Sequence, residues 1–81
     1  MNYAYIVEIY DDEINEWVPT IIMLTTSDEM QMLMDKFADQ SETAIHSVRW
    51  RRITSPEKAD EYHEAGCEIR ARDFNKPIDW S

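Results

Sequence analysis

Acidic side chains have the number and spacing to do chemistry in this 81-residue chain, and the chemistry that they favour is the binding of positively charged groups. Four of them crowd one short segment, at Asp11, Asp12, Glu13 and Glu16. Hard cations bind several convergent oxygens, but this segment lacks the alternating Asp/Asn spacing and the central glycine of a calcium loop. We therefore expect no metal here. We expect instead a protruding loop that contacts lysines and arginines of another protein. A solvated turn is the alternative.

Other carboxylates are expected on the surfaces of two helices. They are Glu57, Asp60, Glu61 and Glu64 in the second half of the chain, and Asp28, Asp35 and Asp39 in the first. Those of the second half recur at three- and four-residue spacing, so neighbours stand about 5–6 Å apart on one face. Such a row resembles the phosphates of a nucleic acid in spacing and sign, and a basic groove could accept it. Neutralisation by Lys58 and nearby arginines is the alternative.

Four arginines suggest an alternative function. They alternate along two expected strands, at Arg49, Arg51, Arg70 and Arg72, and would form one exposed basic stripe if those strands were neighbours. Such a stripe would suit a small nucleic-acid-binding regulator. The alternative, which the surplus of acidic residues favours, is cross-strand or sheet-to-loop pairing of these arginines with carboxylates of the same chain. The net charge of −9 disfavours direct binding to nucleic acid or to an anionic membrane, and no aromatic set is clearly placed beside the arginines to stack bases.

The negative excess lies entirely in the first half of the chain. Residues 1–43 contain ten acidic residues and one basic residue, whereas residues 44–81 contain seven of each. A one-sided field steers encounters with a basic surface, although solubility alone also favours an acidic face. The binding hypothesis therefore depends on the negative charges facing outward over one region of the folded molecule.

Catalytic residues are few. His63 and Cys67 are four apart, but Gly66 is expected to break the helix between them, and His46 alternates with apolar strand residues. Two histidines and one cysteine are too few for zinc without a carboxylate or a second chain, and a single glycine excludes a glycine-rich phosphate loop. We expect a noncatalytic protein without cofactor or metal.

The expected elements follow the order strand, strand, helix, strand, helix, strand. Period-two alternation of β-branched and aromatic residues predicts strands over residues 3–10, 17–25, 44–53 and 67–74. The first two strands form a hairpin with the acidic segment at its tip. Pro19 places the start of the second strand at an edge or a bulge, because proline cannot donate to a ladder.

Two helices are predicted from their start signals. Residues 26–29 form a capping box of the sequence T-S-D-E, and an apolar stripe follows at Met30, Leu33, Met34 and Phe37. Met32 falls off the stripe and is expected to be exposed. The second helix is short and mostly polar, with Ser55 as N-cap, Pro56 at its first position and Gly66 as its stop.

These elements predict an α+β fold in which a mixed or mainly antiparallel sheet of three to four strands carries one main amphipathic helix on one face. The length allows a single domain over residues 1–81. One cysteine excludes an internal disulfide, and the N-terminal segment matches neither a signal peptide nor a membrane span, so we expect a cytoplasmic protein. Trp80 is expected either to anchor a partner or to fold back and close a small core.

The strand Y-A-Y-I-V-E-I-Y, the helix start T-S-D-E-M-Q-M-L-M and the acidic first half together resemble small inhibitors encoded by bacteriophages, including anti-CRISPR proteins. The resemblance is to a class and transfers no functional residues. It implies a stoichiometric inhibitor, acting in a bacterial host cell, that mimics nucleic acid and occupies the basic nucleic-acid-binding surface of a CRISPR effector, polymerase or nuclease. Acidic antitoxins and immunity proteins share these features, and a homodimeric structural subunit stays open as an alternative.

Overall fold

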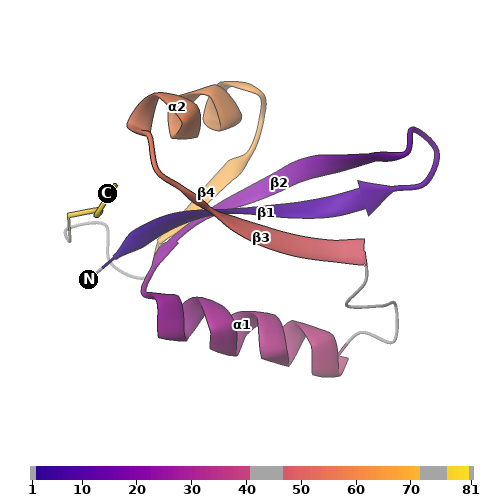
Figure 1. Ribbon diagram of the computed structural model, residues 1–81, viewed down its shortest axis with the longest axis horizontal. Coiled ribbons are helices and arrows are strands. Elements are labelled where there is room, and N and C mark those ends of the chain that lie inside the picture. The colour runs from indigo at the N-terminus through magenta and orange to yellow at the C-terminus, as the bar shows by residue number, and fades with distance from the viewer. Residues whose placement is uncertain (1, 41–46, 72–76, 81) are drawn as a thin grey trace.

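The computed structural model of the protein describes residues 2–40, 47–71 and 77–80, without the side chains of residues 37–40 (Figure 1). Its elements are β1 (Tyr3–Asp11), β2 (Glu16–Thr25), α1 (Ser27–Gln40), β3 (Val48–Ile53), α2 (Pro56–Glu64) and β4 (Glu68–Ala71). This is an α+β fold, and the expected order of elements is confirmed. Residues 44–46 and 72–74, which were expected to belong to strands, lie outside the described residues.

The four strands form one mixed sheet in the order β3-β1-β2-β4. β1 is antiparallel to both β2 and β3, whereas β2 and β4 are parallel. The hairpin therefore fills the centre of the sheet, and α2 connects β3 at one edge with β4 at the other. Because two strands separate β3 from β4, the neighbouring arginine strands required for a single basic stripe do not occur.

Each face of the sheet is covered by a helix (Figure 1). On one face, Met30 and Met34 of α1 pack with Tyr5. On the other, Ala59 and Tyr62 of α2 pack against a cluster around Ile6. The sequence analysis predicted one main helix on one face and assigned no face to α2, since only these few apolar residues in a polar helix mark its buried side. Both faces of β1 are largely apolar, so both need cover.

Pro19 lies at a β-bulge, as one of its two expected positions. The register between β1 and β2 shifts between Val7 and Glu8, with Val7 opposite Ile21 and Glu8 opposite Pro19. Thr20 is the extra residue, and its hydroxyl donates to the Val7 carbonyl oxygen at 2.8 Å. A bulge disrupts the hydrogen-bond ladder locally, so the neighbouring Pro19, which has no N–H, is tolerated there.

The two helix starts differ in how they are capped. At α1 the backbone N–H of Glu29 donates to the Thr26 hydroxyl at 3.2 Å, which confirms this half of the capping box. At α2 the Ser55 side chain caps no backbone N–H and instead donates to the Glu57 carboxylate at 2.7 Å. Pro56 opens α2 as expected, and Gly66 follows its end with a φ of 106°.

Candidate protein-binding surface

The β1–β2 hairpin reaches past α2 at one end of the molecule, away from the two termini (Figure 1). Its turn is held by local contacts. The backbone N–H of Glu13 donates to Asp11 Oδ1 at 2.9 Å, and the Tyr10 hydroxyl donates to Asn15 Oδ1 at 3.4 Å. Asn15 has a φ of 55°, a left-handed conformation that asparagine tolerates better than most residues. The tip is therefore an ordered turn.

The hairpin tip brings together four of the predicted binding residues. Asp12, Glu13 and Glu16 are exposed, and Asp11 is half-buried beside them. Within the described part of the chain, no ion pair involves any of these carboxylates. Ile14, which is 54% exposed, adds an apolar side chain between them. The tip thus combines negative charge with an exposed apolar anchor.

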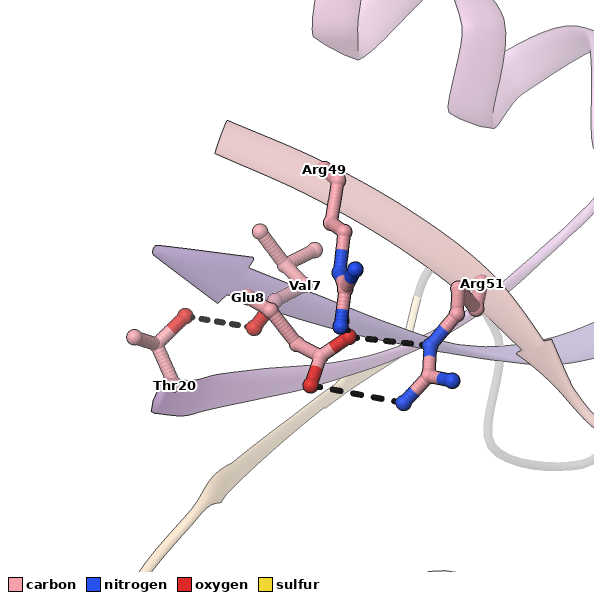
Figure 2. A network of polar contacts seen from close by, with 5 residues as sticks. All are labelled: Val7, Glu8, Thr20, Arg49 and Arg51. Carbon is pink, nitrogen blue, oxygen red and sulfur yellow. Dashed lines mark hydrogen bonds and ion pairs between the residues drawn. The ribbon is translucent and has the colours of Figure 1, made fainter. Parts of the chain in front are cut away.

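The base of the hairpin is joined to β3 by a buried carboxylate that sequence reasoning did not single out (Figure 2). Glu8 is only 4% exposed. Its Oε1 accepts from Arg49 Nε at 3.0 Å and from Arg51 Nε at 2.9 Å, and its Oε2 accepts from an Arg51 terminal nitrogen at 3.4 Å. These bonds satisfy a charge that would be costly to bury alone.

An aromatic pair extends this network toward the hairpin tip. The Arg49 guanidinium lies 4.3 Å from the centre of the Trp17 ring, and Trp17 meets Tyr10 edge-on with ring centroids 5.4 Å apart. Glu8, Tyr10 and Arg49 share one sheet face because Glu8 pairs with Arg49 and β1 alternates with period two. The signal in the sequence was a lone acid in an apolar strand and two arginines spaced by two.

The two predicted arginine pairs are separated in the fold. Arg49 and Arg51 bind Glu8 at the β3 edge, while Arg70, on β4, pairs with Glu68 at 3.4 Å. Arg72 lies outside the described residues. A continuous basic track from β3 to β4 is therefore not formed, because the central strands lie between its halves.

The predicted acidic residues on the helices do not join the hairpin in one surface. Asp28 and Asp35 are exposed on α1, whereas Glu57, Asp60, Glu61 and Glu64 are exposed on α2, which covers the opposite face of the sheet. The side chain of Asp39 lies outside the described residues. The expectation of one outward negative region is therefore wrong for the set as a whole. The alternative of internal neutralisation on α2 is met only at Glu61 among the ion pairs of the described residues, where Lys58 lies 3.3 Å from the carboxylate.

Trp80 is held against the core rather than extended into solvent. The backbone N–H of Asp79 donates to the Asn2 carbonyl oxygen at 2.8 Å, and Ile78 forms a parallel bridge with Asn2. Trp80 is half-buried and packs on the cluster that contains Ile6. This placement favours closure of the core over partner anchoring. Met32, in contrast, is 56% exposed, as its position off the helical stripe predicted.

The residues weighed for catalysis have structural contacts. His63 Nδ1 lies 3.2 Å from the carbonyl oxygen of Cys67 and not against its thiol. The thiol is buried, and burial raises its pKa, which is the opposite of what activates a nucleophile. Among residues 2–40, 47–71 and 77–80, no group of three or more metal-binding side chains converges.

Comparison with protein-family models, curated proteins and solved structures finds no match to this chain. Neither helix in the described part of the chain is both long and apolar enough to cross a lipid bilayer.

Proposed function

We propose that this protein is a noncatalytic inhibitor that docks its hairpin tip on a basic, nucleic-acid-binding surface of a target protein. The target class is a nucleic-acid enzyme such as a CRISPR effector, polymerase or nuclease in the cytoplasm of a bacterial host. The observation that carries the proposal is the protruding tip, where exposed Asp12, Glu13 and Glu16 have no ion-pair partner among the described residues. The carboxylates of α1 and α2, which were expected to share this surface, are not part of the proposed site.

The mechanism is competition for the target's surface. Carboxylates at the tip attract lysines and arginines that would otherwise hold phosphates, so charge steers the encounter. Ile14 supplies an apolar contact at the centre of the charged group, and desolvated contacts of this kind set the residence time. The Glu8 network fixes the base of the hairpin to β3, which limits the conformational entropy lost when the tip docks.

The test compares two variants with the same change in charge. In the hairpin variant D12K/E13K/E16K, the tip is reversed while Asp11, which holds the turn, is kept. In the control D28K/D35K/D60K, three exposed helical carboxylates are reversed instead. We expect the wild type and the control to capture the same nucleic-acid enzyme from a bacterial lysate, and the hairpin variant to lose it.

Association kinetics with the captured enzyme then test the mechanism. The hairpin variant should associate at least about tenfold more slowly, with a weaker dependence on salt, while the control changes less. Capture and association that are equal in both variants would remove the hairpin tip from the binding site. Circular dichroism of both variants checks that the fold is kept.

Binding to nucleic acid is the second candidate, and the Arg49–Trp17 contact favours it. The structure places an aromatic pair beside an arginine, which is the combination found in single-strand binding sites. The Nε atoms of Arg49 and Arg51 and one terminal nitrogen of Arg51 already donate to Glu8, so a nucleic acid would have to bind their other nitrogens. Retention on single-stranded DNA or RNA at low salt that is lost in R49A/R51A, with circular dichroism showing that this variant keeps its fold although Glu8 loses both partners, would support this function over the first.

A further inference from the structure

An apolar groove lies between α1 and the sheet face that it covers, with a volume of about 310 Å³. Its lining comes from all four strands and α1. Arg70 of β4 lines it beside Met23, at the end away from the hairpin tip, and pairs with Glu68. The apolar lining residues that matter here are Val7, Ile9, Met23, Met30, Leu33 and Met34. Two of them reach the surface, since Ile9 is 43% exposed and Leu33 is 36% exposed. Groups of exposed apolar side chains of this kind mark binding surfaces more often than single ones do.

Methionines make up much of this groove. Met23, Met30 and Met34 line it, whereas Met32, two residues away from Met30 and from Met34, is exposed on the other side of α1. A methionine side chain is unbranched and polarisable, so it adapts to apolar partners of different shape, and it is common where a groove receives an amphipathic helix. The lining therefore suits an apolar side chain from a protein partner.

The groove leads toward the acidic hairpin. Ile9 and Thr20, which line it, also line a second hollow that is bordered by Asp11, Asp12 and Glu13. Asp11 follows Ile9 by two residues on β1 and therefore shares its face, and Glu16 pairs with Asp11 across the hairpin. An occupant of the groove thus meets negative charge at the hairpin end.

We propose that this groove receives the apolar side chains of a basic amphipathic segment of the partner, whose lysines and arginines lie against the hairpin carboxylates. The proposal rests on the proposed function and adds the chemistry of the partner. Apolar residues at three- and four-residue spacing, flanked by basic ones, present an apolar face to the groove and positive charge to its acidic end. A second copy of the chain fits less well, because it carries a net charge of −9 and would be repelled by the hairpin carboxylates.

The test uses synthetic peptides and the full chain. The first peptide spans about four helical turns, with leucines on one face and lysines on the other. A second has the same composition in an order without an apolar face, and a third replaces lysine by glutamate. Binding is followed by NMR, with assigned methyl groups. We expect the first peptide to bind at least about tenfold more tightly than the other two, and to shift the methyl signals of Ile9, Leu33 and Met23.

Surface variants identify the groove. I9S and L33S should each weaken binding of the first peptide by about tenfold, whereas M32S, which changes an exposed residue of α1 that does not line the groove, should change it little. Equal binding of the first two peptides, equal binding of the glutamate peptide, or full binding by I9S and L33S would each overturn the proposal. Dispersed amide spectra of the variants show that they are folded.

The lysate experiment separates this inference from the proposed function. If the hairpin variant loses the target while I9S and L33S retain it at wild-type affinity, the groove inference fails and the proposed function stands. If the peptide binds in the groove but the hairpin variant captures the target normally, the proposed function fails and the groove remains a site for basic amphipathic segments.

Discussion

Glu8 is the single residue on which the hairpin's attachment to β3 depends most. It is a carboxylate with 5% of its side chain exposed, between two arginines whose side chains are 40% and 56% exposed. Because the Glu8 carboxylate is buried, it is costly to leave unpaired. The arginines are partly exposed, so solvent screens their charge and weakens the ion pairs. The network therefore specifies the β1–β3 pairing more than it adds net stability, because only this register brings the arginines to Glu8.

We predict that Glu8→Gln lowers the free energy of unfolding by about 1–3 kcal/mol, since it removes the charge that both Arg49 and Arg51 bind. Urea denaturation measures the change. Asp60→Asn, on the exposed surface of α2, removes a carboxylate without an ion pair among the described residues and should stay within about 0.5 kcal/mol of the wild type. Equal stabilities of the two variants would contradict a role for Glu8 in holding the sheet.

Two buried acids make stability depend on alkaline pH. Burial raises the pKa of the Cys67 thiol above its ordinary value of 9.0. Burial also raises the pKa of the Tyr5 hydroxyl above 10.0, although nearby Arg52 opposes the shift. The unfolded chain therefore releases these protons at a lower pH than the folded chain does, so stability is full below the unfolded pKa and falls as pH rises through the folded one.

The predicted outcome is a free energy of unfolding that declines from about pH 9 upward. Urea denaturation at several pH values measures the slope. Cys67→Ala lowers stability at every pH because it empties part of the core, but it should flatten the first part of the alkaline decline. A slope that is the same in Cys67→Ala and the wild type would assign the decline to other groups.

At the scale of elements, the local patterns of the sequence were informative. Alternation predicted the hairpin, Pro19 predicted an edge or a bulge at the start of β2, where the structure has a bulge, and the T-S-D-E segment predicted the start of α1. Each signal acts between residues close in sequence, so it needs no knowledge of the fold. Ser55 shows the limit, because a serine hydroxyl before a helix has several acceptors within reach and here donates to Glu57.

We predict that Thr26→Ala destabilises the protein by about 1 kcal/mol, because the backbone N–H of Glu29 loses its acceptor at the start of α1. Thermal or urea unfolding followed by circular dichroism measures the loss. Ser27→Ala, one residue later and exposed, is the matched control and should change stability by less than about 0.5 kcal/mol. If both substitutions cost the same, the Thr26 cap contributes nothing specific.

At the scale of the whole molecule, the sheet decides which surfaces exist. α1 and α2 lie on opposite faces, so carboxylates that looked like one set in the sequence are divided between them. The same topology separates Arg49 and Arg51 from Arg70. What remains of the predicted site is the hairpin tip, whose residues are close in space because they are close in sequence.

The C-terminal segment closes the molecule at the end opposite the hairpin. Since Trp80 packs on the cluster around Ile6, we predict that Trp80→Ala lowers the free energy of unfolding by about 2 kcal/mol, less than for a fully buried tryptophan. Urea denaturation provides the measurement, with exposed Ile14→Ala as the control that should cost little. Unchanged stability of Trp80→Ala would return this residue to the candidates for partner binding.

By itself, the sequence determined the order of the elements, the α+β class and the acidic hairpin tip, because periodicity, capping and turn chemistry act over a few residues. The tertiary structure alone decided that β3 and β4 lie at opposite edges, that Glu8 meets Arg49 and Arg51, and that Trp80 joins the core. Those contacts join residues far apart in the chain. They form because all the elements bury their apolar surfaces in one folded structure, and no local pattern in the sequence specifies them.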